Sequence, residues 1–444
     1  APRITGFSPL SRQFLKNLPF SPTNAQERVA EELAHDMAQG SPMLRLVQGD
    51  VGSGKTLVAA RAILDTVAAG YQVAFMAPTE LLAEQHFQSL EAWLTPLALS
   101  VNWLSGRIKG KARKTILGEL AAGTVSILVG THALFQDEVV FRRLGLIVVD
   151  EQHRFGVHQR LHLAAKGVDG GHPHQLALTA TPIPRSLAMV TYGDLDCSVI
   201  DELPPGRTPI TTTLIDTDRR EAVIRRVGAA CGNGRQAYWV CTAIEESDSL
   251  DLEAAEATRD YLGEALPEVR IGMVHGRMKA PEKAEMMANF KSGFIQLLVA
   301  TTVIEVGVDV PNASLMIIDN AERLGLAQLH QLRGRVGRGV VESHCLLLYR
   351  QPLSETARER LQVMQQTHDG FVIAEADLRI RGPGELLGTR QTGMAQFRIA
   401  RLPEHESLLI EAQAIANNLY TEDSARTKAL IARWAGPRAD FARV

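Results

Sequence analysis

The amino-acid sequence predicts an α/β fold in which two consecutive domains with parallel β-sheets precede a helical C-terminal segment. Three observations support this prediction. A glycine-rich loop at residues 49–56 lies between a short apolar run and a helical stretch. Short β-rich runs alternate with helical stretches in two blocks, and a proline-rich junction at 202–209 separates the blocks. Beyond about residue 350 the β-rich runs end and helical periodicity remains.

The first block predicts a doubly wound sheet. Its apolar runs lack the alternation of half-exposed strands, as expected for parallel strands that are buried on both faces. Helical patterns, one of them starting at Thr79, separate the runs. The predicted strands are 43–47, 72–77, 126–129, 144–150 and 175–179.

The second block repeats this alternation without a phosphate-binding loop of its own. We therefore predict three domains, at 1–206, 207–350 and 351–444. In the last of them a glycine-rich loop separates two helices. The predicted strands of the second block are 237–241, 270–274, 295–300 and 313–318, and the predicted helices from there on are 250–266, 281–292, 356–366 and 404–419.

Size and composition agree with several soluble domains. At 444 residues the chain is too long for one hydrophobic core. Lys and Arg number 47 against 50 Asp and Glu, and the net charge of −3 means that any polyanion must bind to local patches. The sequence has no 18-residue apolar run, no signal-peptide pattern and no cysteine spacing typical of a metal site. We therefore predict a cytoplasmic protein without a membrane partner.

Residues 49–56 match the phosphate-binding pattern G-x-x-x-x-G-K-[ST]. Backbone N–H groups of such a loop and the dipole of the following helix converge on phosphates. We expect Lys55 to reach the β- and γ-phosphates of a nucleoside triphosphate and the Thr56 hydroxyl to ligate Mg²⁺. The alternative is a glycine-rich turn that binds nothing. The loop residues are Gly49, Asp50, Val51, Gly52, Ser53, Gly54, Lys55 and Thr56.

Two carboxylates end the predicted strand 144–150. In a parallel sheet this end of a strand lies beside the phosphate loop. We expect Asp150 to hold Mg²⁺, and Glu151 to orient and deprotonate the water that attacks the γ-phosphate. A solvated acid pair is the alternative. Two hydroxyls after the next strand, those of Thr179 and Thr181, could report the γ-phosphate to the neighbouring domain, although such a Thr/Pro turn is structural more often than not.

Residues 331–338 place basic side chains at short spacing on the second block. The planar guanidinium group of arginine meets two oxygens at once, which suits it to spreading transition-state charge. If the two domains face each other, Arg335 and Arg338 can act as arginine fingers within one chain. A solvated basic loop or a contact to DNA phosphate is the alternative for either residue.

Three weaker patterns remain. Five basic residues lie within 107–114, where a solvated face is as plausible as a contact to nucleic acid. Basic side chains flank glycines in a predicted loop at 379–384, where backbone N–H groups could approach phosphates, although turn chemistry alone also explains the glycines. His172 and His174 have no acidic or thiol neighbour, so we interpret them as loop residues and not as metal ligands.

The ordered set of segments resembles the motifs of superfamily 2 helicases, in which two RecA-like domains enclose ATP and Mg²⁺. The segments are 49–56, 77–81, 130–133, 150–153, 179–181, 299–311 and 331–338. By this resemblance, Phe20 and Gln26 contact adenine, while Asp309 approaches the ribose and phosphates. The resemblance also implies nucleotide contacts for Gly307 and Gln331, and DNA coupling for His153, Thr179 and Thr181.

Within that superfamily the chain is most similar to the RecG family. The segments 152–160, 325–335 and 377–393 are the basis of this similarity. The resemblance implies two tandem RecA-like P-loop domains followed by a helical hairpin and a loop that convert domain closure into movement on duplex DNA. It makes Arg360, Arg381 and Gln391 candidate coupling residues.

The family resemblance implies a function. We expect an ATP-hydrolysing translocase on double-stranded DNA that remodels forks and Holliday junctions in recombination and repair. Its expected partners are branched DNA and a single-stranded-DNA-binding protein, and we expect a monomer in the bacterial cytoplasm, associated with the nucleoid. RecG proteins also carry an N-terminal wedge domain; since the chain starts shortly before Phe20, we expect a fragment without it.

Two alternatives stay open at this point. One is a translocase that displaces DNA-bound proteins, such as a transcription-repair coupling factor. The other is a nucleotide-switched DNA-binding scaffold, which Glu151 together with Arg335 and Arg338 disfavours because a pure switch can dispense with them.

Overall fold

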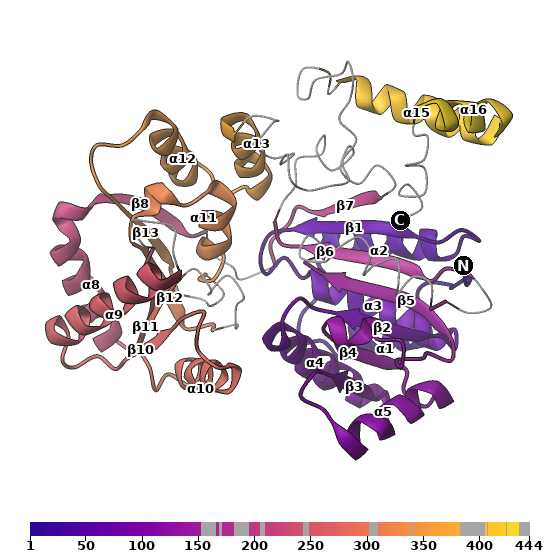
Figure 1. The fold of residues 1–444 in the computed structure, drawn as a ribbon, viewed down its shortest axis with the longest axis horizontal. Coiled ribbons are helices and arrows are strands. Elements are labelled where there is room, and N and C mark those ends of the chain that lie inside the picture. Colours follow the sequence, from indigo (N-terminus) through magenta and orange to yellow (C-terminus); the bar gives the residue numbers. More distant parts are fainter. Residues whose placement is uncertain are drawn as a thin grey trace.

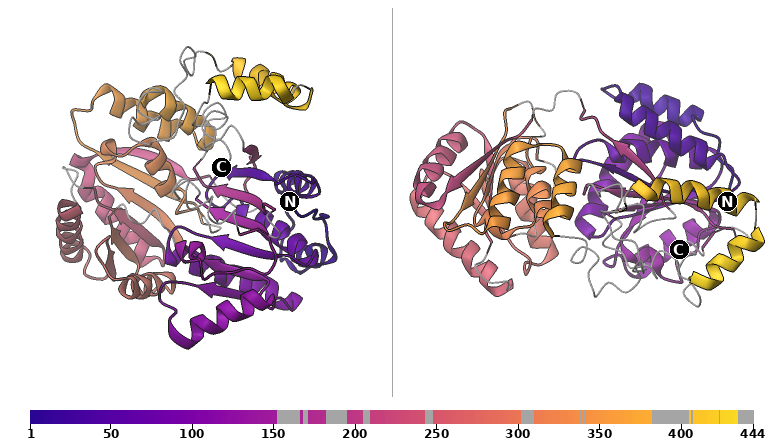
Figure 2. Two further views of the ribbon diagram at one scale, coloured as in Figure 1. Left: turned by 45° about the vertical axis from the view of Figure 1, so that its right-hand side comes forward. Right: turned by 90° about the horizontal axis from the view of Figure 1, so that it is seen from above.

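The protein contains two parallel β-sheets, each flanked by helices, and further helices at its C-terminal end (Figure 1). The computed structural model describes residues 1–151, 166–167, 171–181, 195–204, 209–242, 248–301, 310–337, 339, 341–381, 405, 407–422 and 424–434. Among these residues no helix is long and apolar enough to cross a membrane. The predicted α/β class is confirmed, with the sheets side by side and not stacked (Figures 1 and 2).

The first sheet has seven parallel strands in the order β3-β4-β2-β5-β6-β1-β7. The central strands β2, β4 and β5 are buried throughout except for Asp150 at the end of β5, as the uninterrupted hydrophobic runs predict. The strands are β1 (Leu44–Gly49), β2 (Gln72–Met76), β3 (Val101–Leu104), β4 (Ile127–Gly130), β5 (Leu144–Asp150), β6 (His174–Thr179) and β7 (Asp196–Ile200).

Helices cover this sheet and position the glycine-rich loop. The α3 helix follows β1 after the loop 50–54, and its residues 57–66, most of them apolar, are buried. The α2 helix begins with a capping box in which Thr23 and Gln26 bond each other's backbone N–H groups. The helices are α1 (Pro9–Asn17), α2 (Asn24–Met37), α3 (Lys55–Ala68), α4 (Glu80–Leu94) and α5 (Gly110–Ala122).

The second sheet has six parallel strands in the order β10-β11-β9-β12-β13-β8. Its strands are β8 (Thr211–Asp216), β9 (Gln236–Val240), β10 (Ile271–Val274), β11 (Leu297–Ala300), β12 (Ala313–Ile318) and β13 (His344–Tyr349). The helices between them are α8 (Arg220–Gly232), α9 (Asp248–Ala265), α10 (Ala280–Lys291) and α11 (Leu326–Arg333).

The C-terminal helices form two pairs. In the first pair, α12 (Glu355–Gln366) and α13 (Gly370–Arg381) belong to the hydrophobic core of the second domain through Leu361, Met364 and Ile373. The second pair, α15 (Ser407–Glu422) and α16 (Ser424–Trp434), lies on the side of the first domain (Figures 1 and 2).

Several elements differ from the sequence prediction. The strands β3, β7, β8 and β13 were not predicted; β3, β7 and β8 lie at sheet edges, and Thr, Ser or Asp make up much of β7 and β8. The predicted loop at 379–384 is also partly wrong, since α13 continues through Arg379 to Arg381. His174 does not lie in a loop either: it opens β6, where its Nδ1 accepts from the Met43 N–H and its Nε2 donates to the Pro2 carbonyl.

Candidate nucleotide site between the two sheets

The glycine-rich loop connects β1 to α3 at the end of the first sheet that faces the second domain. Gly49 ends β1, residues 50–54 form the turn, and Lys55 and Thr56 open α3. Gly54 has a φ of 87°, and a Cβ there would come within 2.2 Å of Gln26 Nε2, so only glycine fits. Lys55 Nζ donates to the carbonyl oxygens of Gly49 at 2.6 Å and Asp50 at 2.9 Å. The loop thus holds the ammonium group at the start of α3.

Gln26 ties the N-terminal segment to this loop. Its Oε1 accepts from the Thr23 N–H at 3.0 Å and its Nε2 donates to the Ser53 carbonyl at 2.8 Å. An amide group has two N–H donors and two acceptor lone pairs, so these bonds use half of its capacity. The ring of Phe20, by contrast, is 49% exposed. Gln26 is only 3% exposed, so the ring of Phe20 is the more accessible of the two side chains.

Asp150 is the last residue of β5 and lies beside Lys55 and His86. His86 Nε2 and Asp150 Oδ2 are 2.7 Å apart, and since a carboxylate only accepts, the ring nitrogen donates. Burial alone would raise the pKa of Asp150, but the hydrogen bond and charge of His86 and the charge of Lys55 lower it below its usual value. The carboxylate is held ionised, as a hard-metal ligand must be.

Glu151 follows in a left-handed backbone conformation with a φ of 51°, which is rare outside glycine. Its Oε1 accepts from the Ala180 N–H, and its Oε2 accepts from the Thr179 hydroxyl, both at 3.3 Å. Burial, followed by the neighbouring charge of Asp150, raises the pKa of Glu151, while Lys55 and Arg335 oppose the shift. The pKa values of the two adjacent carboxylates are therefore shifted in opposite directions. A lowered pKa suits Asp150 to bind a metal ion, and a raised pKa suits Glu151 to accept a proton.

The second domain completes the site from the opposite side. Gln331 Nε2 of α11 donates to the Thr181 hydroxyl at 3.3 Å. His330 Nε2 lies 3.4 Å from Asp50 Oδ1. Arg335 is close enough for its charge to act on Glu151. The structure thus brings α11 and the turn after it against both the phosphate loop and the carboxylates.

The other face of this segment contacts the C-terminal helices. Arg333 is buried and donates to the carbonyl oxygens of Met364 at 3.0 Å and Thr367 at 2.9 Å, where α12 ends. Arg360 of α12 donates to the Glu322 and Leu324 carbonyls, each at 2.9 Å. The hairpin of α12 and α13 is therefore fastened to the residues on either end of α11.

Some predicted site residues lie outside the described part of the chain. They are His153, Gly307, Asp309, Arg338 and Gln391. Arg381 is the last residue of α13, and its side chain is likewise outside the described part. Sequence reasoning missed three residues that the structure places at the site: His86, His330 and Arg333. Only spatial proximity reveals them, since each partner is distant along the chain.

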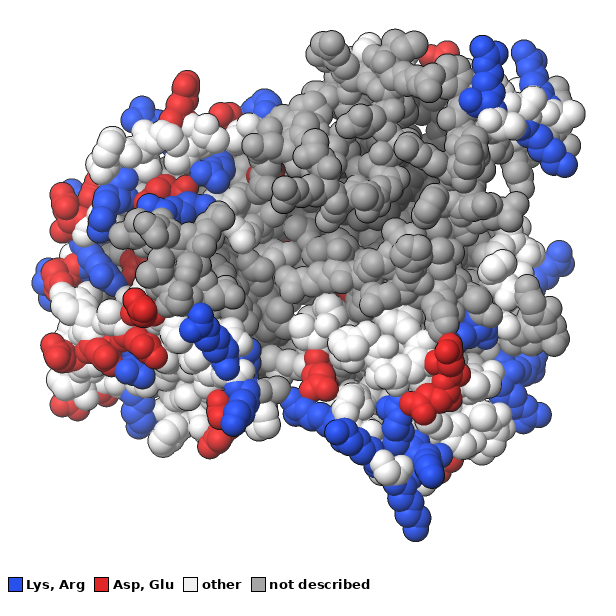
Figure 3. Space-filling model, in the orientation of Figure 1, with Lys and Arg blue, Asp and Glu red and all other residues white. Residues whose placement is uncertain are grey.

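The basic segment 107–114 lies at the start of α5, where Figure 3 shows basic side chains gathered at the lower end of the first domain. Two of its arginines have acidic partners: Arg107 bonds Glu80 at 2.7 Å and Arg113 bonds Glu138. The lysines of the segment are exposed. In the second basic segment, 379–384, Arg379 bonds Glu359 at 2.8 Å on the surface of the hairpin.

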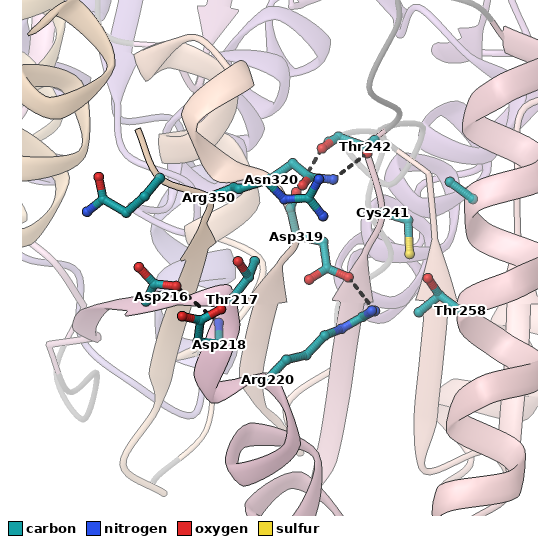
Figure 4. A pocket seen from close by; sticks show the side chains of 12 residues that line it. Asp216, Thr217, Asp218, Arg220, Cys241, Thr242, Thr258, Asp319, Asn320 and Arg350 are labelled. Atoms are coloured by element: carbon teal, nitrogen blue, oxygen red, sulfur yellow. Dashed lines mark hydrogen bonds and ion pairs between the residues drawn. The ribbon is translucent and has the colours of Figure 1, made fainter. Parts of the chain in front are cut away.

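A polar cavity of about 630 Å³ lies within the second domain (Figure 4). It is lined by residues that follow the carboxyl ends of β8, β9, β12 and β13. There Asp319 bonds Arg220 at 2.8 Å and the indole of Trp239 at 2.7 Å, and Asn320 bonds the Thr242 carbonyl at 2.9 Å. These bonds link the cavity's own walls, and acidic and basic groups are mixed in it. The phosphate loop therefore remains the better candidate for an anionic ligand.

Three family models match the chain in the order of its domains. The DEAD/DEAH box helicase model matches residues 23–190, and the helicase conserved C-terminal domain matches residues 219–340. The third model, the C-terminal part of domain 3 of the ATP-dependent DNA helicase RecG, matches residues 367–432, which begin after α12 and run from α13 into α16. The chain belongs to the RecG family.

Curated RecG relatives resemble the chain along nearly its whole length. The ATP-dependent DNA helicase RecG of Escherichia coli K12 is 62% identical over 427 residues, which are 96% of this chain and 62% of the relative. RecG of Pasteurella multocida is 59% identical over 98% of the chain and 63% of the relative. The chain therefore spans less than two thirds of the length of these RecG proteins.

Solved structures agree with this assignment. A RecG bound to a three-way DNA junction has a TM-score of 0.76 and 42% identity, covering 92% of this chain and 53% of that one. The yeast protein Dbp5 bound to RNA has a TM-score of 0.60 at only 14% identity, so it shows the shared fold alone.

Proposed function

We propose that this chain is the motor part of a RecG-type helicase, which hydrolyses ATP to move along double-stranded DNA and remodels branched DNA. The observation that supports it best is the contact of α11 with the nucleotide side of the first domain, through Gln331 to Thr181 and Arg335 toward Glu151. A solved relative at 42% identity binds a three-way DNA junction, which supports a branched substrate.

Residues of the first domain fit a nucleoside triphosphate with Mg²⁺. Asp150 is ionised at the carboxyl end of β5, and the Thr56 hydroxyl lies at the start of α3, so both supply the oxygen ligands that Mg²⁺ prefers. The Lys55 ammonium is held at the mouth of the loop by two carbonyl oxygens that a phosphate can replace. When bound, the ion would neutralise charge on the phosphate oxygens.

The chain's own groups then account for the chemistry. Glu151 has a raised pKa and accepts two hydrogen bonds that fix its carboxylate, which suits it to orient a water molecule and take its proton. Arg335 brings positive charge from the other domain and would stabilise charge that develops on the transferred phosphoryl group. Gln26 and Phe20 would select adenine. We also propose that Gly307 contacts the nucleotide, that Asp309 approaches the ribose and phosphates, and that Arg338 acts as a second arginine finger.

Movement would follow from the attachment of α11 to the hairpin. Release of the nucleotide would loosen the Gln331–Thr181 contact, and Arg333 would pass the displacement of α11 to the end of α12. We propose that Arg360, Arg381 and Gln391, together with His153, couple this displacement to DNA. Further proposals are a monomeric state, a single-stranded-DNA-binding partner, and a bacterial cytoplasmic location near the nucleoid.

One assay separates this function from the alternatives. ATP hydrolysis is measured with no DNA, single strands, duplex and a three-way junction, for the wild type and for Lys55→Ala. A helicase motor shows rates that rise with duplex or junction and vanish in Lys55→Ala. A nucleotide-switched scaffold would show a slow rate that no DNA accelerates, which would refute the proposal. A motor that only displaces proteins would respond to plain duplex and junction alike.

A further inference from the structure

The α4 helix joins the candidate metal ligand Asp150 to the second domain. Its N-terminal residue Glu80 follows the Thr79 cap, and the helix lies on the side of the first domain that faces the second (Figure 1). Near this end Leu81 packs against the hydrophobic core of the second domain. His86, one and a half turns later, bonds Asp150. A single helix, α4, therefore contacts both the second domain and Asp150.

The imidazole of His86 is held in place on two sides. Its ring centroid lies 4.6 Å from that of Phe75, a fully buried residue of β2. Its Nε2 lies 2.7 Å from Asp150 Oδ2, and both side chains are 13% exposed. β2 and β5 are paired, with Phe75 beside Val148, so the ring rests on the strand next to the one that carries Asp150. The ring cannot move without moving α4 or breaking this packing.

From this geometry we propose that His86 is a positioning residue that fixes the orientation of the Asp150 carboxylate, and that α4 makes this orientation depend on the contact of Leu81 with the second domain. The inference rests on the proposed function, since it assumes that Asp150 serves a nucleotide–metal site. His86 binds Oδ2 of the carboxylate, so this bond sets the direction in which Oδ1 points. Residues that orient a metal ligand in this way raise metal affinity, and their loss commonly lowers it by roughly 10- to 100-fold.

We call the connection from Leu81 through α4 and His86 to Asp150 the relay. It gives the contact of α4 with the second domain a role. In the structure Leu81 belongs to the first domain by sequence but packs against side chains of the second. When the domains separate, Leu81 loses that contact and the N-terminal turn of α4 loses its support from the second domain, while Ala83, Leu90 and Leu94 stay buried in the core of the first. A shift of this end of α4 would move His86 and with it the Asp150 carboxylate. The metal ligand would thus be in place only when α11, with Gln331 and Arg335, is in place as well.

The test measures metal binding and not turnover. Mn²⁺, a paramagnetic substitute for Mg²⁺, is titrated into the full chain with saturating ADP, and free Mn²⁺ is followed by electron paramagnetic resonance. We expect His86→Ala to weaken Mn²⁺ affinity roughly 10- to 100-fold. His86→Gln, whose amide Nε2 can still donate, should recover affinity to within about threefold of wild type. Ser89→Ala on the exposed face of α4 is the matched control and should bind as wild type does.

A double-mutant cycle tests the relay itself. Leu81→Ala should weaken Mn²⁺ binding in the wild-type background but cause no further loss in the His86→Ala background, because both changes act through Asp150. Equal affinity in wild type and His86→Ala, or independent effects of the two substitutions, would overturn the inference. Failure of the wild-type chain to bind Mn²⁺ with ADP would instead refute the proposed nucleotide site. Thermal unfolding of each variant confirms that it folds.

Discussion

Gly334, in the turn after α11, lies so close to Val51 of the phosphate loop that a Cβ on Gly334 would be 2.9 Å from Val51 Cβ. Real Cβ atoms do not approach that closely, so a glycine is required for the two domains to meet here. The contact adds a steric element to the hydrogen bond of Gln331 and the charge of Arg335. Together they make the phosphate loop part of a domain interface as well as a binding loop.

Gly334→Ala should therefore impair closure of the domains. Overpacking a fitted contact costs about 1–3 kcal/mol, which corresponds to a roughly 5- to 150-fold lower rate of duplex-stimulated ATP hydrolysis. Steady-state rates check this. Gly232→Ala in α8 is the control, because a Cβ there meets nothing within 4 Å. An unchanged rate in Gly334→Ala would show that the domains do not come together in this way during turnover.

Glu151→Gln should lower ATP hydrolysis by roughly 10²- to 10⁴-fold, the usual contribution of a general base. It should also stabilise the protein at neutral pH. The folded protein holds the protonated form of Glu151 more tightly than the unfolded chain does, so the ionised carboxylate costs stability once the pH passes the unfolded pKa, about 4.3. Thermal unfolding should show a higher Tm for the variant at pH 8 and little difference near pH 4. A lower Tm at pH 8 would contradict the raised pKa.

The Gln331–Thr181 bond should couple the two residues energetically. Gln331→Ala and Thr181→Ala should each reduce duplex-stimulated hydrolysis, and the double variant should be less impaired than the sum of the two effects. For side chains in direct contact, coupling energies of about 0.5–3 kcal/mol are typical. A full double-mutant cycle of hydrolysis rates measures this. Strict additivity would mean that the bond plays no part in turnover.

Arg360→Ala should loosen the hairpin from α11. Each bond from a charged donor to a carbonyl contributes about 1.5–3 kcal/mol, and the variant loses two of them. We expect a lower Tm and a larger loss in DNA-stimulated than in unstimulated hydrolysis. Arg358→Ala, an exposed neighbour on α12, serves as the control. Equal losses with and without DNA would assign Arg360 a purely structural role.

The sequence predicted those features that depend on local pattern. The phosphate loop and the carboxylates at the end of β5 follow from short motifs and from an uninterrupted apolar strand. Arg379 was placed in a loop because Gly382 and Pro383 follow it closely, yet helical residues continue up to that break. The strand β8 was missed because three threonines open it, and its pairing with β13 becomes visible only in the sheet.

The remaining part of the site depends on distant contacts. His86 lies 64 positions from Asp150, and Gln331 lies 150 positions from Thr181. No periodicity or motif predicts that such pairs meet, because the fold alone brings them together. The role of His330 beside Asp50 is of the same kind. The contacts of Gln331 and His330 join the two domains, whereas His86 and Asp150 both belong to the first, and no local segment encodes either kind of contact.

The most direct test of the central claim, that one ATP site is shared by the two domains, is the rate of duplex-stimulated ATP hydrolysis by Arg335→Ala. Arginine fingers contribute roughly 10³- to 10⁵-fold to turnover. We expect a loss of this order, with ATP binding within a few-fold of wild type, because Lys55 and the phosphate loop remain intact. Hydrolysis by Arg335→Ala at the wild-type rate would show that the first domain works alone and would contradict it.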